Sequence, residues 1–380
     1  MKSKTLKYQK KLLIQVILAV TFMFFFNEFL IYYVTQIQCS WPELDKNTEE
    51  VKIKPTKEEP VKAIIIADTH LLGSRNGHWF DKLRREWQMY RAFQTAMILH
   101  KPDLVFVLGD LMDEGLWCGN EEFKRYVERF YSLFNIPDDV QMYLAVGNHD
   151  IGFHYGISPY LNNRFVTGFN SPSVQLVSLK GNHFVLINSM ALEGDGCFLC
   201  KPAEMQIKKI QNLFECTKRP NTTSCKDASK LITFSRPILM QHFPLYRKSD
   251  IECTDDDAAP EDIKKQLFKE KWQCVSKEAS NQLLKQLHPR LVVSGHTHHG
   301  CTRKLVIGDG VEISIPSFSW RNKNNPNYGM AIFTPNNYAF SKCKMPQEST
   351  VIHLYILSVL VILCWIIYSL QKIKFAKKYS

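Results

Sequence analysis

Acidic residues are absent from both ends of this chain. The first 11 and the last 10 of its 380 residues hold nine lysines and no aspartate or glutamate, within a formal net charge of +11. The rest of the chain is therefore nearly neutral and has no basic stripe that a phosphate backbone could follow. We expect a protein that does not bind nucleic acid.

A cleavage site of small residues is missing from the first of two long apolar segments, residues 12–34 and 351–370. The first segment runs through Phe24-Phe25-Phe26 into Asn27-Glu28, so we expect a retained anchor rather than a cleaved signal peptide. Each segment is long enough to cross a hydrocarbon core of about 30 Å. Glu28 would cost about 2.5–3.5 kcal/mol at the membrane centre, and less towards the end of the segment where it lies.

Lysines flank both segments on their terminal sides, so the positive-inside rule predicts cytosolic tails at residues 1–11 and 371–380. Residues 35–350 would then be lumenal. We expect linkers at 35–60 and 336–350 and one folded domain at 61–335. The chain would be a multi-pass membrane protein.

Two short motifs fit this topology. Asn221-Thr222-Thr223 is a sequon for N-glycosylation, which takes place in the lumen. Lys377 and Lys378 stand third and fourth from the end, and they resemble the dilysine retrieval signal that coat proteins read on cytosolic tails.

Ten cysteines lie outside the apolar segments, an even number that an oxidising lumen could pair. The spacing does not settle the pairs, although Cys216–Cys225 and Cys253–Cys274 would each close a short loop. Cys197-Phe198-Leu199-Cys200 has the spacing of a zinc-ligand pair. The sequence has no second CxxC to complete it, so zinc is the less favoured interpretation.

Five short apolar runs mark the predicted sheets. They are residues 63–67, 104–108, 142–146, 237–240 and 291–294. Runs this short and continuous are typical of strands covered on both faces. Amphipathic stretches at 79–100 and 121–135 predict crossover helices between the first three strands, and 261–288 predicts another helix. We also expect a hairpin at 174–179 and 184–189, turning around Gly181-Asn182, and a second sheet with further strands around 302–334. The predicted fold is α/β, a two-sheet α-β-β-α sandwich flanked by transmembrane helices.

A polar cluster follows each of these runs. The clusters supply seven side chains that ligate metals: Asp68, His70, Asp110, Asn148, His242, His296 and His298. The carboxyl ends of strands gather ligands at one edge of a sheet. One metal takes four to six ligands, so seven predict two ions, with the Asp110 carboxylate as the bridge. Each cluster alone could be a strand-end cap or a turn, but five together favour a metal site.

The motifs D-x-H, G-D, G-N-H-D, H and G-H-x-H, in this order, resemble those of the calcineurin-like metallophosphoesterase family over roughly residues 61–335. The resemblance implies one metal on Asp68, His70, Asp110 and His298, and a second on Asp110, Asn148, His242 and His296. It implies two divalent cations, with Mn²⁺ favoured over Fe or Zn²⁺, that lower the pKa of a bound water. It also makes His149 the acid that protonates the leaving alkoxide, with Asp150 orienting its ring.

The flanking segments extend the resemblance. EFLIYYVTQIQCSWPEL after the first apolar segment, together with the terminal KKYS, resembles membrane-bound members of the family that act on GPI anchors. The resemblance implies a phosphodiesterase of the ER exit sites, ER-Golgi intermediate compartment and cis-Golgi. It would remove the side-chain ethanolamine phosphate from the second mannose of the glycan, with GPI-anchored proteins and their cargo receptors as partners.

Other functions are compatible with the same set of predicted ligands. A membrane-bound nucleotidase or a lipid-linked phosphodiesterase of the same family would differ only in its pocket. A catalytically inactive lumenal receptor for export cargo is the alternative from another class. The complete ligand set disfavours it, because a receptor has no need of seven ligands and a general acid.

Overall fold

The computed structural model describes residues 2–45, 59–75, 77–220, 225 and 231–378. Its strands form two sheets, with the orders β11-β10-β1-β2-β3 and β4-β5-β6-β7-β9-β8. The first sheet contains β1 (Val61–Ile66), β2 (Leu104–Leu108), β3 (Gln141–Ala145), β10 (Asn327–Phe333) and β11 (Tyr338–Lys344). The second contains β4 (Val174–Leu179), β5 (Asn182–Ile187), β6 (Ile238–Gln241), β7 (Leu291–Ser294), β8 (Cys301–Lys304) and β9 (Val311–Ser314).

The two sheets face each other across an apolar layer. In β1, Ala63 and Ile65 belong to this inner layer, whereas Ile64 and Ile66 belong to the cluster that includes the outer helices. This alternation follows from the pleat of a strand, which sends successive side chains to opposite faces. Phe106 of β2 and Phe184 of β5 meet across the layer with ring centroids 4.9 Å apart.

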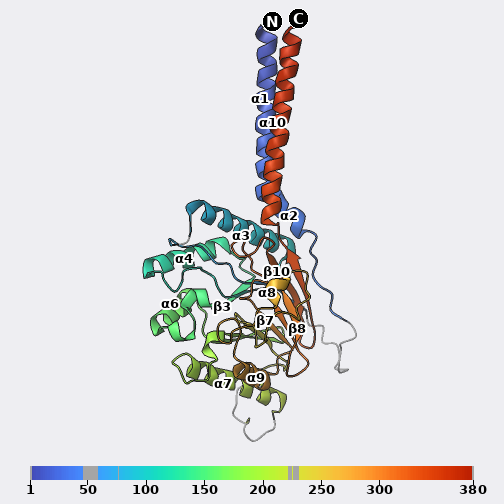
Figure 1. The fold of residues 1–380 in the computed structure, drawn as a ribbon. Helices are drawn as coiled ribbons and strands as arrows, with labels where there is room; N and C mark the ends of the chain where they lie inside the picture. The colour runs from blue at the N-terminus through green and yellow to red at the C-terminus, as the bar shows by residue number, and fades with distance from the viewer. Residues whose placement is uncertain (1, 46–58, 76, 221–224, 226–230, 379–380) are drawn as a thin grey trace.

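Helices cover the outer face of each sheet (Figure 1). The first sheet carries α3 (Trp79–His100) and α4 (Asn120–Leu133), and the second carries α7 (Cys200–Lys218) and α9 (Lys277–Leu287). Shorter helices follow β3 and β5: α5 (Asn148–Ile151), η3 (His154–Gly156), α6 (Pro159–Phe169) and η4 (Ser189–Ala191). The predicted α-β-β-α sandwich is therefore confirmed.

Three local predictions are wrong. The helix expected over 261–288 is two helices, α8 (Glu261–Lys264) and α9, separated by residues 265–276, in which Lys271 has φ 68° and so cannot belong to a right-handed helix. The hairpin turns at Lys180-Gly181, both with positive φ, rather than at Gly181-Asn182. The linker expected at 336–350 contains β11, which pairs along its whole length with β10.

The placement of the late strands also differs from the prediction. Strands β8 and β9 join the second sheet as expected, but β10 pairs antiparallel with β1 in the first sheet. Residues 61–344 therefore form the folded domain, and the chain returns to its first strand before it leaves the domain.

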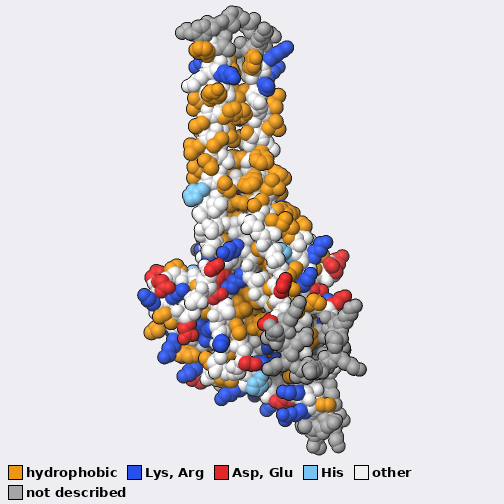
Figure 2. All heavy atoms as spheres, turned by 90° about the vertical axis from the view of Figure 1, so that its right-hand side faces the viewer, with side chains coloured by type: hydrophobic (Ala, Val, Ile, Leu, Met, Phe, Trp, Pro, Cys, Tyr) orange, Lys and Arg blue, Asp and Glu red, His pale blue; other side chains and the backbone are white. Residues whose placement is uncertain are grey.

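Two apolar helices project side by side from this domain and bring both chain ends to the same place (Figure 1). One is continuous through α1 (Lys2–Phe25), the π-helical η1 (Phe26–Leu30) and α2 (Ile31–Gln36), and the other is α10 (Glu348–Lys378). Figure 2 shows that hydrophobic side chains cover most of the pair, with lysines near the far tip. Residues 6–36 and 348–375 are long and apolar enough to cross a membrane.

The bases of both helices are tied to the domain. The Gln36 side chain donates to the carbonyl of Ala92 and accepts from the hydroxyl of Tyr328, and Ile31 is buried as well. The end of the apolar segment predicted at 12–34 therefore packs against protein. The carboxylate of Glu28 accepts a hydrogen bond from the hydroxyl of Tyr355 in α10, so it has a partner within the helix pair.

Three disulfides are present among the described residues. Cys216–Cys225 confirms one predicted pair, but Cys253 bonds to Cys301 rather than to Cys274. Those two cysteines are 48 residues apart, so the fold brings together partners that a preference for short loops did not predict. The third disulfide, Cys39–Cys343, joins the chain just after α2 to β11. The sequon at 221–223 lies outside the described residues.

Candidate metal centre

All seven predicted ligands lie together beyond the carboxyl ends of five strands: β1, β2 and β3, which are parallel in the first sheet, and β6 and β7, which are parallel in the second. Two groups of ligand atoms have all their members within 4.8 Å of one another: Asp68, His70 and His298, and Asp110, His242 and His296. Asn148 joins the second group, with its Oδ1 3.2 Å from His242 Nε2. Asp110 Oδ2 lies 3.5 Å from His70 Nε2 and 3.3 Å from His242 Nε2, which places this carboxylate between the two groups.

The backbone turns sharply at these positions. Five of the seven residues have left-handed conformations: Asp68, His70, Asp110, His296 and His298, with φ of 56°, 45°, 50°, 71° and 59°. Each costs of order 1–3 kcal/mol for a residue with a side chain, and such strain collects at functional sites. The turns direct side chains from separate strands into one volume.

Glycines in two motifs allow this close approach. A Cβ at Gly147 would lie 2.2 Å from Asp110 Oδ1, and a Cβ at Gly109 would lie 2.6 Å from His242 Nδ1. Gly109 also has φ 83°, which favours glycine for a second reason. The glycines of G-D and G-N-H-D are therefore required by packing against the ligands.

Three histidine rings are held with one nitrogen facing the centre. The outer nitrogen of each lies at hydrogen-bonding distance from an acceptor: His242 Nδ1 at 2.7 Å from the Leu108 carbonyl, His296 Nε2 at 2.9 Å from the Trp272 carbonyl, and His70 Nδ1 at 3.1 Å from Asp113 Oδ1. A carbonyl or carboxylate oxygen only accepts, so the outer nitrogen carries the hydrogen. The inner nitrogen then presents its lone pair, as in metal-binding histidines.

The donor set fits divalent cations. His70 Nε2 is buried and has no hydrogen-bond partner among the described residues, although it lies 3.9 Å from Asp68 Oδ1 and 3.5 Å from Asp110 Oδ2. An orphaned ring nitrogen facing two buried carboxylates is explained by a cation between them. Imidazole and carboxylate donors without thiolate suit Mn²⁺, Fe or Zn²⁺.

Burial shifts the pKa values of several groups in the centre. Burial raises the pKa of Asp68 above its usual value. Burial acts in the same direction on Asp110, but the neighbouring His242, His70 and His149 together outweigh it and lower the pKa of Asp110 well below the usual value. Burial, with the neighbouring His242, lowers the pKa of His296 to about 3, and burial with His70 lowers that of His298. Both rings are therefore neutral at physiological pH, which is the form that binds metals.

His149 and Asp150 lie in different surroundings. The His149 side chain is 42% exposed beside His70, and its Nδ1 lies 3.1 Å from the carbonyl oxygen of Asp113. Asp150 is fully buried and accepts hydrogen bonds from the backbone N–H groups of Leu111, Met112 and Gly147. The expectation that Asp150 orients the His149 ring is therefore wrong, since Asp150 instead holds the G-D and G-N-H-D loops together.

Asp113 is the residue that the sequence patterns missed. Its carboxylate lies 3.1 Å from His70 Nδ1, 3.6 Å from His149 Nδ1 and 3.4 Å from the guanidinium of Arg321. Its position three residues after Asp110 was the only sequence cue. It positions two histidines, one of which is a predicted ligand.

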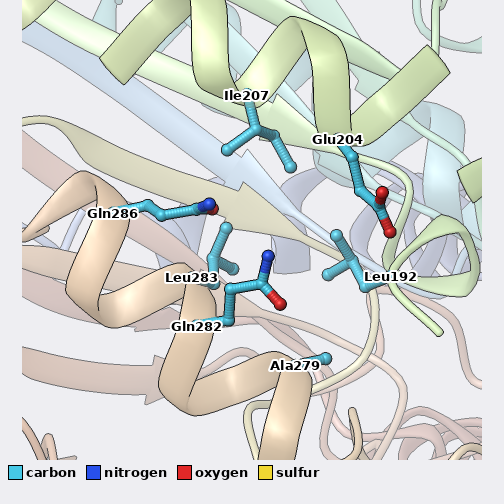
Figure 3. A pocket seen from close by; sticks show the side chains of 7 residues that line it. All are labelled: Leu192, Glu204, Ile207, Ala279, Gln282, Leu283 and Gln286. Atoms are coloured by element: carbon cyan, nitrogen blue, oxygen red, sulfur yellow. The ribbon is translucent and has the colours of Figure 1, made fainter. Parts of the chain in front are cut away.

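A pocket between α7 and α9 lies apart from this centre (Figure 3). Its lining residues are Leu192, Glu204, Ile207, Ala279, Gln282, Leu283 and Gln286. None of them is a predicted ligand, and they include a single ionisable side chain. The chemistry of the molecule is located by the converging ligands and not by this cavity.

We predict that Asp113→Asn weakens metal binding by about 10–100-fold, the usual effect of losing a carboxylate that orients a ligating histidine. An amide can present its NH₂ to His70 Nδ1 and so remove the preference for the productive tautomer. Metal titration of the purified chain, followed by elemental analysis, measures the change. Asp139→Asn, at an exposed site, is the control. Unchanged affinity in Asp113→Asn would show that Asp113 does not orient His70.

Known proteins resemble the chain in sequence. The calcineurin-like phosphoesterase family profile matches residues 61–300. Metallophosphoesterase 1 of Gallus gallus is 46% identical over 357 residues, covering 93% of this chain and 89% of that protein. Metallophosphoesterase 1 of Xenopus laevis is 48% identical over 347 residues, covering 89% and 84%.

Among solved structures, purple acid phosphatase PPD1 from yellow lupin aligns with a TM-score of 0.45 at 11% identity, covering 78% of this chain and 55% of that one. The sequence matches span the strands and loops that supply the ligands. Calcineurin-like phosphoesterases use a dimetal centre, and two groups of candidate ligands occur here. The chain therefore belongs to the calcineurin-like phosphoesterase family and is a metal-dependent phosphoric-ester hydrolase.

Proposed function

We propose that this enzyme is a membrane-bound phosphodiesterase that removes the side-chain ethanolamine phosphate from the second mannose of GPI-anchor glycans. The resemblance of the segments around the apolar helices supports this substrate. The observation that carries the proposal is that one loop contacts both the metal centre and the base of α10. A GPI glycan lies at the membrane surface, so its hydrolase needs an active site near the point where its membrane helices leave the domain.

A loop at residues 317–321 makes this connection. Ser317 Oγ donates to the carbonyl of Asp68 at 2.7 Å, and Arg321 lies 3.4 Å from Asp113. Between them, Trp320 Nε1 donates to the carbonyl of Pro346 at 2.9 Å, two residues before α10 begins. One loop thus contacts both the metal-ligand cluster and the base of a candidate membrane helix.

Arg84 strengthens the same junction. Its guanidinium lies 5.3 Å from the centroid of the Trp320 ring and 3.1 Å from the carboxylate of Glu348, in the first turn of α10. The base of α10 and the loop beside the centre are therefore held by one side chain of α3. This arrangement supports a substrate that reaches the centre from the membrane surface.

The proposed roles of the ligands follow from their two groups. Asp68, His70, Asp110 and His298 would hold one cation, and Asp110, Asn148, His242 and His296 the other, with Mn²⁺ as the proposed metal. When bound, two such cations lower the pKa of a water and stabilise charge on the phosphoryl oxygens. The Asp110 carboxylate is shared between the groups, so its loss affects both.

His149 is proposed as the general acid. Its Nδ1–H is engaged by the Asp113 carbonyl, so a second proton would be carried on Nε2 and delivered to the oxygen of the leaving sugar. Its exposed ring at the edge of a buried cluster supports this role. Asp113, rather than Asp150, sets the orientation of the ring.

The proposed topology has both apolar helices in the membrane, cytosolic tails and a lumenal domain in the early secretory pathway. Three disulfides support an oxidising compartment. Coat proteins would read Lys377 and Lys378, whose side chains lie outside the described part of the structure. GPI-anchored proteins and their cargo receptors are the proposed lumenal partners.

Mass spectrometry of GPI glycans tests the substrate directly. Cells lacking the protein should accumulate glycans that keep ethanolamine phosphate on the second mannose, and re-expression should remove it. Asp110→Asn is the matched variant and should not restore removal. If the GPI glycans are unaltered and the purified chain hydrolyses a nucleotide or a lipid-linked diester, the protein is instead a nucleotidase or a lipid-linked phosphodiesterase. No turnover of any diester with any divalent metal would indicate the cargo receptor.

We predict that His149→Ala keeps its metals but loses roughly 10²–10⁴-fold in rate on alkyl diesters, the share that general acid catalysis usually contributes. The loss should be smaller on a nitrophenyl diester, because nitrophenolate leaves without a proton. His78→Ala, at the exposed start of α3, is the control. Equal losses on the two substrates would rule out proton donation to the leaving group.

The dilysine signal and the sequon at Asn221 would lie on opposite sides of the membrane, so together they test the topology. Changing Lys377 and Lys378 to Ser should move the protein to later Golgi compartments, seen as resistance of the Asn221 glycan to endoglycosidase H. Hydrolysis of a soluble diester should be unchanged. Digestion of the domain by protease outside sealed microsomes would place it in the cytosol and overturn the topology.

A further inference from the structure

Four side chains with metal-binding atoms meet outside the centre described above. They are His154, Asp195, Cys197 and Cys200, and one ligand atom from each lies within 4.8 Å of all the others. His154 comes from η3, directly after the helix that carries Asn148 and His149. The other three come from the segment that leads into α7. The sequence supplied only the CxxC half of this set, because His154 is 43 residues away along the chain from Cys197.

The histidine is oriented as a ligand. His154 Nδ1 lies 2.9 Å from the carbonyl oxygen of Met190, and Nε2 faces the cluster, 2.8 Å from Asp195 Oδ2. With a metal ion in the cluster, Nδ1 would donate its hydrogen to the Met190 carbonyl and Nε2 would present its lone pair. The residue is 7% exposed, and a carbonyl acceptor on the far nitrogen is the usual support of a metal-binding ring.

The local backbone shapes the other half of the cluster. Gly194 and Gly196, with φ of 69° and 71°, allow the chain to turn on both sides of Asp195. Cys200 begins α7 and is completely buried, and its backbone N–H lies 2.9 Å from Cys197 Sγ. An N–H directed at sulfur stabilises negative charge on it, as a thiolate ligand requires.

The carboxylate completes the cluster. Asp195 Oδ2 lies 2.8 Å from His154 Nε2, and Asp195 Oδ1 lies 3.3 Å from Cys200 Sγ. An imidazole, a carboxylate and a buried sulfur therefore meet at one point, where a divalent metal would stabilise the carboxylate and the thiolates together.

We propose that His154, Asp195, Cys197 and Cys200 form a structural zinc site, separate from the dimetal centre. Two sulfurs, one imidazole and one carboxylate make four donors, the number that Zn²⁺ takes in closed tetrahedral sites. Thiolates select Zn²⁺ over Mn²⁺, which prefers oxygen, so the two sites of this chain would sort their metals by ligand type. Binding would release the two thiol protons to solvent and change no oxidation state.

The site would brace the wall of the dimetal centre. It joins the loop after the G-N-H-D motif to the start of α7. The neighbouring Phe153 packs on Trp272 with ring centroids 4.4 Å apart, and the Trp272 carbonyl accepts from His296. Glu193, on the other side, pairs with Lys271 at 2.6 Å. Zinc would thereby fix segments that hold His149 and His296 without itself contacting them.

Metal analysis of the full-length chain in detergent tests the proposal. Wild type should carry about one zinc per chain that Cys200→Ser lacks, the stoichiometry of a single four-ligand site, while manganese bound at the dimetal centre stays equal in the two proteins. Cys274→Ser, which removes another buried free cysteine, is the matched control and should keep its zinc. Asp195→Ala changes an exposed loop residue, and it should weaken zinc retention against a chelator.

Cobalt distinguishes the two sites by spectrum. After reconstitution with Co²⁺ alone, wild type and Cys274→Ser should show an intense thiolate-to-cobalt band in the near ultraviolet, which nitrogen and oxygen ligands do not produce. Cys200→Ser should lose this band. The dimetal centre contains no cysteine, so cobalt bound there leaves the result unaffected.

Two results would overturn the site. One is a Cys197–Cys200 disulfide in the purified protein, detected as thiols that alkylate only after reduction and not after chelation. The other is equal zinc content in wild type, Cys200→Ser and Asp195→Ala. Neither result bears on the phosphodiesterase activity, so the zinc site and the proposed function can fail independently.

Discussion

The burial of two carboxylates at one point is the constraint on which the rest of the centre depends. Asp68 and Asp110 are 0% and 1% exposed, and their charges cost several kcal/mol each unless compensating groups surround them. Imidazoles from three separate segments supply part of that compensation, and the ring nitrogen of His70 without a partner indicates that cations supply the remainder. The left-handed turns and the close-packed glycines follow from this need, because they bring ligands from different strands to one place.

The second constraint is mechanical. The apolar helices are not tethered by flexible chain: Gln36 is buried between α3 and β10, and Cys39–Cys343 bonds the exit of one helix to the strand that precedes the other. The loop at 317–321 then connects the base of α10 to Asp68 and Asp113. The orientation of the centre relative to the helix pair is therefore set by covalent and hydrogen-bonded contacts.

The third feature is the wall that closes around His149 and His296. It is built from segments with little regular structure, including residues 152–156, 193–199 and 265–276. Hydrogen bonds, an ion pair and a stacked aromatic pair hold them, and the proposed zinc site would add a covalent link. Such segments have low intrinsic rigidity, so cross-links have the largest effect there.

Local patterns in the sequence determined the strands of the sandwich core, the long crossover helices and the polar residues at the strand ends. Strand and helix periods are properties of neighbouring residues, and parallel strands necessarily bring their carboxyl ends to one edge. The seven proposed ligands could be chosen for that reason before any contact was known.

Only the tertiary structure decided the contacts between distant segments. It placed β10 beside β1, paired Cys253 with Cys301, and brought His154 to the CxxC pair. It also decided the hydrogen-bond partners of the ligands. The carbonyls of Leu108 and Trp272 orient two histidines, yet every residue has a carbonyl, so their identity leaves no trace in the sequence. Asp113, rather than Asp150, lies beside the His149 ring for a related reason: a carboxylate bonds whichever donors the folded chain brings to it.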